Sequence, residues 1–156
     1  MTTERHPWGP TMSATDRDWL LQTIRLSRRC APVSTAYNVG AVLVRGGTVI
    51  TEGHSRETDT AVHAEEAALA KAAGQLLTGA TLYTSLEPCT TRASRPADCT
   101  RLILDAGIAR VVFAMREPPR FARCEGVATL RAAGVEVVEI GELAPEVLRV
   151  NAHLLG

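Results

Sequence analysis

Three residues with good metal-ligand side chains, and one carboxylate beside them, stand in the middle of this sequence. His63, Cys89 and Cys99 offer one nitrogen and two sulfurs, and Glu65 follows the histidine by two positions. Three protein ligands leave the fourth zinc position open for water, which is typical of a catalytic site, whereas structural zinc sites close all four positions. A carboxylate beside the metal can take a proton from that water and deliver it to a substrate. The pattern predicts a catalytic zinc site in which Glu65 transfers protons.

The ligands lie on different predicted elements, so the fold must bring them together. Residues 63–73 are rich in alanine and leucine and predict a helix that stops near Gly74. A strand at 81–86 leads to Cys89, and open α/β sheets place their sites at the carboxyl ends of strands. The second cysteine opens a short helix at 99–106, where the aligned backbone dipoles favour a thiolate.

The remaining pattern predicts a mixed α/β sheet. Two short apolar runs separated by Arg-Gly-Gly read as an antiparallel hairpin. From residue 81 onward strands alternate with helices, which predicts parallel strands joined by right-handed crossovers. The other predicted elements are strands 39–44, 48–51, 110–115 and 135–140 and helices 15–29, 127–133 and 146–155.

Length, charge and cysteine content restrict the class of protein. The 156 residues predict a polar tail at 1–14, in which Met12 is an alternative start, and one domain at 15–156. The formal net charge of zero argues against a general nucleic-acid binder. Four scattered cysteines do not suggest a secreted disulfide framework. No signal peptide or membrane-spanning run is visible, so we expect a cytoplasmic protein without a membrane partner.

Each motif alone also has an ordinary structural interpretation. The histidine and glutamate fit the first turn of an amphipathic helix, and the two cysteines fit buried thiols where elements meet. Only the combination favours a metal site. Cys30 and Cys124 have no ligand-like neighbours in the sequence, although Cys124 is a reserve candidate for the third ligand.

A His-x-Glu that opens a helix, followed by Pro-Cys and a further cysteine, is the signature of zinc nucleobase deaminases. The chain resembles the cytidine deaminase-like superfamily, with its CMP/dCMP-type zinc deaminase domain, and most resembles the pyrimidine deaminase domain of riboflavin biosynthesis. The resemblance implies a three-layer α/β/α sandwich with a five-stranded mixed sheet, bound Zn²⁺ and a homodimer. The matching segments are 39–42, 63–65, 84–89, 102–103, 106–108 and 132–137, with Cys99 and Asn151.

The resemblance also implies roles for individual residues. His63, Cys89 and Cys99 hold the zinc, and Glu65 moves protons during hydrolytic deamination of an amino-substituted pyrimidine-type small molecule, with release of ammonia. The substrate is a riboflavin-precursor-like compound or a cytosine nucleoside or nucleotide. The expected substrate-binding residues are Asn38, Ala64, Ser85 and Glu87. Arg92 and Arg95 are added from the residues themselves, because arginine exceeds acidic residues between positions 92 and 123, although these arginines also fit a solvated face.

The sequence departs from that family where substrate contacts are expected. Nine residues, 90–98, separate the two cysteines, against two in most superfamily members, and they lack the His and Gly of the riboflavin enzymes. Asn38 is shifted towards the first strand, and Glu117-Pro-Pro replaces the family's Asp-Pro-Asn-Pro. We therefore expect a substrate other than, or broader than, the riboflavin precursor, with Arg92 or Arg95 binding an anionic or polar substituent.

Other classes of function stay open. A non-catalytic zinc module needs no carboxylate beside its ligands, so Glu65 weighs against it. A tRNA- or single-stranded-DNA-editing deaminase usually adds a basic or aromatic surface, and here aromatic residues make up only 4% of the chain. A deaminase of a guanine-type nucleobase or of a specialised metabolite is compatible with the same site.

Overall fold

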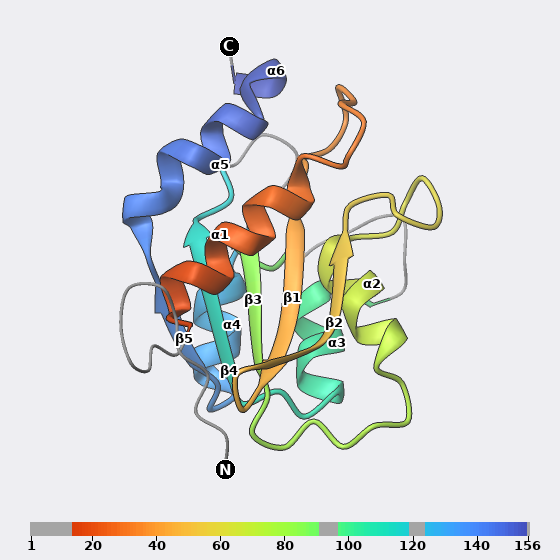
Figure 1. The fold of residues 1–156 in the computed structure, drawn as a ribbon, viewed down its shortest axis with the longest axis vertical. Helices are drawn as coiled ribbons and strands as arrows, with labels where there is room; N and C mark the ends of the chain where they lie inside the picture. The colour runs from red at the N-terminus through yellow and green to blue at the C-terminus, as the bar shows by residue number, and fades with distance from the viewer. Residues whose placement is uncertain (1–13, 91–96, 119–123, 156) are drawn as a thin grey trace, which may run out of the picture.

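A five-stranded sheet in the order β2-β1-β3-β4-β5 runs through the middle of the protein (Figure 1). The computed structural model of the chain describes residues 14–90, 97–118 and 124–155. β1 pairs antiparallel with β2 and β3, whereas β3, β4 and β5 are parallel, which confirms the predicted mixed sheet. The strands are β1 (Gly40–Arg45), β2 (Thr48–His54), β3 (Thr81–Leu86), β4 (Arg110–Met115) and β5 (Glu136–Glu139).

Helices cover both faces of the sheet and complete the three layers (Figure 1). α1 and α5 pack together on one face, and α2, α3 and α4 lie on the other. No helix in the described part of the chain has the length and apolar character needed to cross a membrane. The helices are α1 (Asp16–Ser27), α2 (Ala64–Lys71), α3 (Cys99–Asp105), α4 (Gly126–Ala132), η1 (Gly141–Leu143), α5 (Ala144–Val150) and α6 (Ala152–Leu155).

The central strands are buried because both of their faces are covered by helices. β3 and β4 each bury every residue after the first, which explains their continuous apolar sequences. Two glycines allow the helices to approach this sheet closely. A Cβ at Gly40 would lie 1.9 Å from the carbonyl oxygen of Thr23 in α1, and one at Gly53 would lie 2.6 Å from that of Ala64 in α2. α2 therefore starts directly against β2.

The prediction of one continuous last helix over 146–155 was wrong. Two helices occupy this range instead: α5 begins directly after η1, and Asn151 separates it from the short α6. The buried Asn151 side chain binds the carbonyl oxygen of Val147 at 3.0 Å and both backbone polar groups of Asn38. Because Asn38 lies 113 positions away in the sequence, local helical periodicity could not show the interruption.

Asp16 links the start of α1 to three strands. Its carboxylate accepts two hydrogen bonds from the Arg110 guanidinium, at 3.0 and 2.7 Å, and one from the Tyr83 hydroxyl at 2.6 Å. Arg110 also contacts Glu136 of β5. The hydrogen bond from Arg110 holds the pKa of Asp16 below its ordinary value of 3.8. The cluster therefore stabilises the fold while Asp16 is ionised.

We expect Asp16→Asn to lower the free energy of unfolding by about 1–2 kcal/mol at neutral pH, a value reduced for partial solvent exposure. Because the folded-state pKa is depressed, the carboxylate's contribution is complete above the unfolded-state value and is lost as pH falls through the folded-state value. The difference from wild type should narrow below about pH 4. Urea denaturation measures both effects.

Asp105→Asn is the matched control, because Asp105 pairs with Arg101 on an exposed helix surface. It should change the free energy of unfolding by no more than about 0.5 kcal/mol. Equal losses from the two variants would contradict the role assigned to Asp16.

Candidate active site

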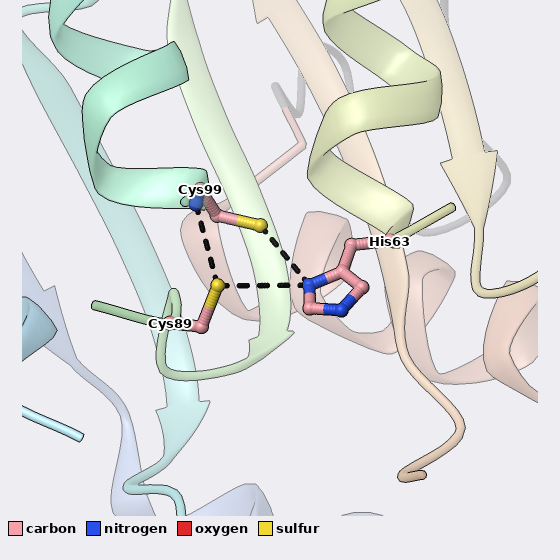
Figure 2. A group of neighbouring side chains, drawn as sticks. All are labelled: His63, Cys89 and Cys99. Atoms are coloured by element: carbon pink, nitrogen blue, oxygen red, sulfur yellow. Dashed lines mark hydrogen bonds between the residues drawn. The ribbon is translucent and has the colours of Figure 1, made fainter. Parts of the chain in front are cut away.

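Three elements meet at one edge of the sheet and bring the predicted ligands together (Figure 2). Cys89 lies three residues beyond β3, at the carboxyl end of the parallel strands. His63 directly precedes α2, and Cys99 is the first residue of α3. Both helices therefore begin at this edge, and their N-terminal dipoles favour negative charge there.

The three side chains form one compact group. Nδ1 of His63 lies 3.3 Å from Sγ of Cys99 and 3.6 Å from Sγ of Cys89. All three ligand atoms lie within 4.8 Å of one another, and among the described residues this is the one group of its kind. Cys89 and Cys99 are buried, and His63 is partly exposed.

Backbone groups of α3 hold Cys89 in place. The N–H of Cys99 donates to Sγ of Cys89 at 3.3 Å, and the N–H of Thr100 donates to the Cys89 carbonyl oxygen at 3.2 Å. The Cys99 side chain, with a smaller contribution from His63, lowers the pKa of Cys89 to about 5. Cys89 therefore favours the thiolate form, which is the form that binds a metal.

The donor set fits zinc. One imidazole nitrogen and two thiolate sulfurs suit this ion, and three protein ligands leave a position for water or substrate. The ligand atoms already lie within reach of a single ion without rearrangement of the backbone.

Glu65 occupies the first turn of α2, two residues after His63, and is only 4% exposed. Burial raises the pKa of its carboxyl group, and the imidazole of His63 opposes the rise. The nearby Cys89 raises the pKa further. A buried carboxyl group with a raised pKa, placed beside a metal site, can both accept and return a proton.

Residues 13–115 match the family model of the cytidine and deoxycytidylate deaminase zinc-binding region. The chain belongs to this family. The match covers β1 to β4 and includes every residue of the His63, Cys89 and Cys99 group.

Relatives from riboflavin biosynthesis resemble this deaminase-family chain. It is 37% identical over 126 residues to the diaminohydroxyphosphoribosylamino-pyrimidine deaminase of Schizosaccharomyces pombe, covering 78% of this chain and 31% of that protein. It is 40% identical over 118 residues to riboflavin biosynthesis protein RibD of Escherichia coli, with 76% and 31% coverage. The chain thus spans less than a third of these relatives' length.

A solved structure shows the same fold. The diaminohydroxyphosphoribosylaminopyrimidine deaminase/5-amino-6-(5-phosphoribosylamino)uracil reductase of Thermotoga maritima superposes with a TM-score of 0.80 at 34% identity. The superposition covers 90% of this chain and 40% of the other. The expected cytidine deaminase-like fold is confirmed.

The two other cysteines lie outside the ligand group. Sγ of Cys124 donates to the carbonyl oxygen of Pro88 at 3.1 Å, and burial raises the pKa of this thiol. Cys124, the reserve candidate, is therefore held as a neutral thiol beside the site, and the geometry favours Cys99 as the third ligand.

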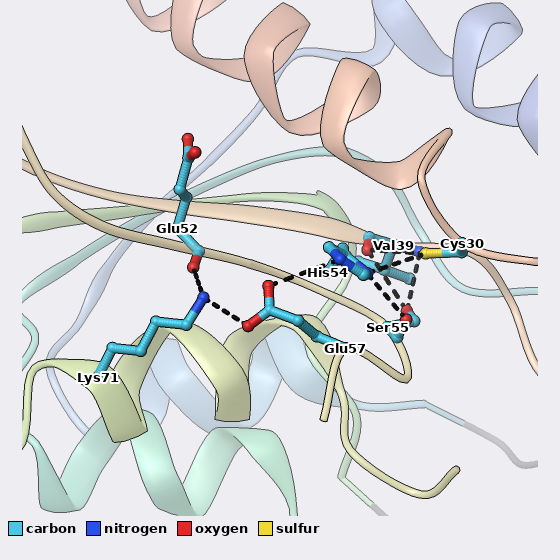
Figure 3. A network of polar contacts seen from close by, with 7 residues as sticks. All are labelled: Cys30, Val39, Glu52, His54, Ser55, Glu57 and Lys71. Carbon is cyan, nitrogen blue, oxygen red and sulfur yellow. Dashed lines mark hydrogen bonds and ion pairs between the residues drawn. The ribbon is translucent and has the colours of Figure 1, made fainter. Parts of the chain in front are cut away.

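Cys30 belongs to a separate polar network (Figure 3). Its Sγ lies 3.9 Å from Nδ1 of His54, but that nitrogen also lies 3.1 Å from the carbonyl oxygen of Ser55. Burial raises the pKa of Cys30, so it is no activated nucleophile. The rest of the network, from His54 through Glu57 to Lys71, ties the loop after β2 to α2.

Two predicted substrate contacts are engaged with the protein backbone. Oγ of Ser85 accepts the N–H of Gly40 at 3.2 Å. The two carboxylate oxygens of Glu87 accept the N–H groups of Glu117 and Val127, each at 3.1 Å. These contacts join β1, β3, β4 and α4 around the site. That Ser85 and Glu87 also contact substrate stays a prediction.

The other predicted contacts differ in their placement. Ala64 is fully buried at the start of α2, and Asn38 is buried just before β1. Arg92 and Arg95 lie outside the described residues. The substrate roles of these four residues stay predictions.

Sequence reasoning did not select Glu117 as a site residue. Burial raises the pKa of its carboxyl group to about 7, and the charges of Cys89 and Glu65 add to the rise, while the Cys124 side chain opposes it. Glu117 is therefore a second acid near the ligands. Its place just beyond β4, at the carboxyl end of a parallel strand, was the signal that could have identified it.

We expect the purified protein to bind about one metal ion per chain, because the three ligands form one site. Cys99→Ala should lose this metal, since two ligands remain. Cys124→Ala is the matched control and should retain it. Elemental analysis of dialysed proteins measures the metal, and equal loss from both variants would mean that the third ligand is misassigned.

Proposed function

We propose that this protein is a zinc-dependent hydrolytic deaminase of a small aminated pyrimidine. The observation that carries the proposal is the meeting of His63, Cys89 and Cys99 beside the buried Glu65. A site that only stabilised the fold would need no buried carboxyl group at this position. The cytoplasmic location and the homodimer stay predictions.

The roles of the residues follow from their chemistry. His63, Cys89 and Cys99 would hold the ion through Nδ1 and two thiolates. When bound, zinc supplies a Lewis acid that lowers the pKa of a water molecule towards neutrality. Glu65 takes one proton from the attacking water and gives it to the ring nitrogen. It then takes the second proton from the hydroxyl group that has formed on the ring carbon and gives it to the departing amino group. The water oxygen replaces the amino group, the C–N bond breaks and ammonia leaves.

The relatives support a substrate class. The Schizosaccharomyces pombe and Thermotoga maritima enzymes are named for a diaminohydroxyphosphoribosylaminopyrimidine, which combines an aminated ring with a phosphate group. We propose a substrate of this class, with Arg92 and Arg95, which stand between the two cysteines in the sequence, as candidates for binding its phosphate.

Ammonia release tests the proposal. The zinc-loaded protein is incubated with diaminohydroxyphosphoribosylaminopyrimidine, deoxycytidylate, cytidine and guanine. We expect release from the first compound, or from another aminated pyrimidine of the panel. Release from guanine alone would contradict the substrate class, and no release from any compound would contradict the deaminase assignment.

Glu65→Gln keeps the size of the side chain but cannot carry a proton. We expect kcat to fall by at least about 10²–10⁴-fold, the usual contribution of general acid–base catalysis, with metal content unchanged. Glu142→Gln, on the exposed η1 turn, is the control and should turn over like wild type. Near wild-type turnover by the Glu65 variant would exclude its role in proton transfer.

Arg92→Ala and Arg95→Ala test phosphate binding. A charge-assisted hydrogen bond of about 1.5–3 kcal/mol corresponds to a rise in KM of about tenfold to a hundredfold for a phosphorylated substrate. An analogue without phosphate should be little affected. If both variants treat the two compounds as wild type does, substrate specificity does not depend on Arg92 or Arg95.

A further inference from the structure

Arg56 holds together two segments that border the site. Its backbone N–H donates to the carbonyl oxygen of Val62 at 2.8 Å and closes the loop that leads to His63. Its guanidinium donates to the carbonyl oxygens of Ala31, at 3.1 Å, and of Tyr37, at 3.3 Å. Its φ is 59°, a left-handed conformation that side chains rarely adopt and that often occurs at functional sites.

The same guanidinium also binds Oδ1 of Asn38. Asn38 is only 2% exposed, and Asn151 holds both of its backbone polar groups, at 2.7 Å and 3.2 Å. The main chain of Asn38 and the oxygen of its side-chain amide are therefore fixed. Within residues 14–90, 97–118 and 124–155, its amide nitrogen Nδ2 makes no hydrogen bond.

The guanidinium determines which end of the amide is available. A guanidinium has only donors, so it selects the amide oxygen and leaves the Nδ2 donor on the other side. A buried donor without a partner costs free energy. An acceptor that binds beside Nδ2 removes this cost by accepting its hydrogen bond.

The sheet register places Asn38 at the edge that carries the ligand group. Asn38 lies two residues before β1, whose first residue, Gly40, pairs with the last residue of β2. Gly40 also binds Ser85 of β3, four residues before Cys89. The start of β1 and the end of β3 therefore lie side by side.

We propose that Arg56 is a positioning residue that turns the Asn38 amide so that Nδ2 donates a hydrogen bond to an acceptor oxygen of the substrate. A ring carbonyl oxygen or a sugar hydroxyl meets this requirement. The inference rests on the proposed function, because it deepens the account of the same site.

Asn38→Asp tests the polarity of the contact. Aspartate keeps the size of the side chain and an oxygen for Arg56 but removes the donor. We expect KM for the aminated pyrimidine substrate to rise about tenfold, with kcat within about twofold of wild type and metal content unchanged. An unchanged KM would overturn the proposal.

A double-mutant cycle tests whether Arg56 acts through Asn38. Arg56→Met should raise KM as Asn38→Ala does, and the double variant should be no worse than Asn38→Ala alone. Independent, additive effects would contradict a positioning role. Arg131→Met is the matched control, because Arg131 also donates to a backbone carbonyl, that of Val137, but in another part of the fold; its KM should equal that of wild type.

Calorimetric binding of the same pyrimidine separates this inference from the proposed function. If wild type binds the compound without turnover, the deaminase assignment fails and the Asn38→Asp affinity still decides the inference. If wild type binds none of the panel, both fail. Should Arg56→Met not fold, as judged by its thermal transition, Asn38→Asp alone decides, because its contact with Arg56 is preserved.

Discussion

The contact between the end of β3 and the start of α3 is the constraint on which the site depends. Cys89 is bound there twice, through its carbonyl oxygen to Thr100 N–H and through its sulfur to Cys99 N–H. Glu87 binds main-chain N–H groups beyond β4 and in α4, so the strand end is also fixed from the other side. Cys89 thus takes its position from hydrogen bonds with the backbone at the start of α3.

Hydrogen bonding and burial explain why the pKa values of Cys89 and Glu65 shift in opposite directions. Contacts from Cys99 and His63 lower the pKa of Cys89, whereas burial raises the pKa of Glu65. Two thiolates beside each other need compensation, which a divalent ion provides, and the remaining carboxyl group is then suited to proton transfer. Burial likewise raises the pKa of Glu117, which lies just beyond β4.

The sequence predicted the five strands and the ligand group because these features rest on local signals. Apolar runs identify β3 and β4, and residue type with spacing identifies His63 and the two cysteines. Long-range side-chain contacts left no such signal. Asn151 interrupts the last helix through a partner 113 positions away.

Arg56 was missed for a similar reason. Nothing in the sequence indicates a left-handed backbone at a residue other than glycine. Its partners Ala31, Tyr37 and Asn38 come near it through the pairing of β1 with β2. Sequence therefore indicates which chemistry is present, and the tertiary hydrogen bonds indicate how it is oriented.

X-ray absorption at the zinc edge of the zinc-loaded protein tests the central claim most directly. The account predicts two sulfur neighbours at about 2.3 Å and two nitrogen or oxygen neighbours at about 2.0 Å, one of them exchangeable. Three or more sulfur neighbours, or a closed set of four protein ligands, would contradict a catalytic site built from His63, Cys89 and Cys99.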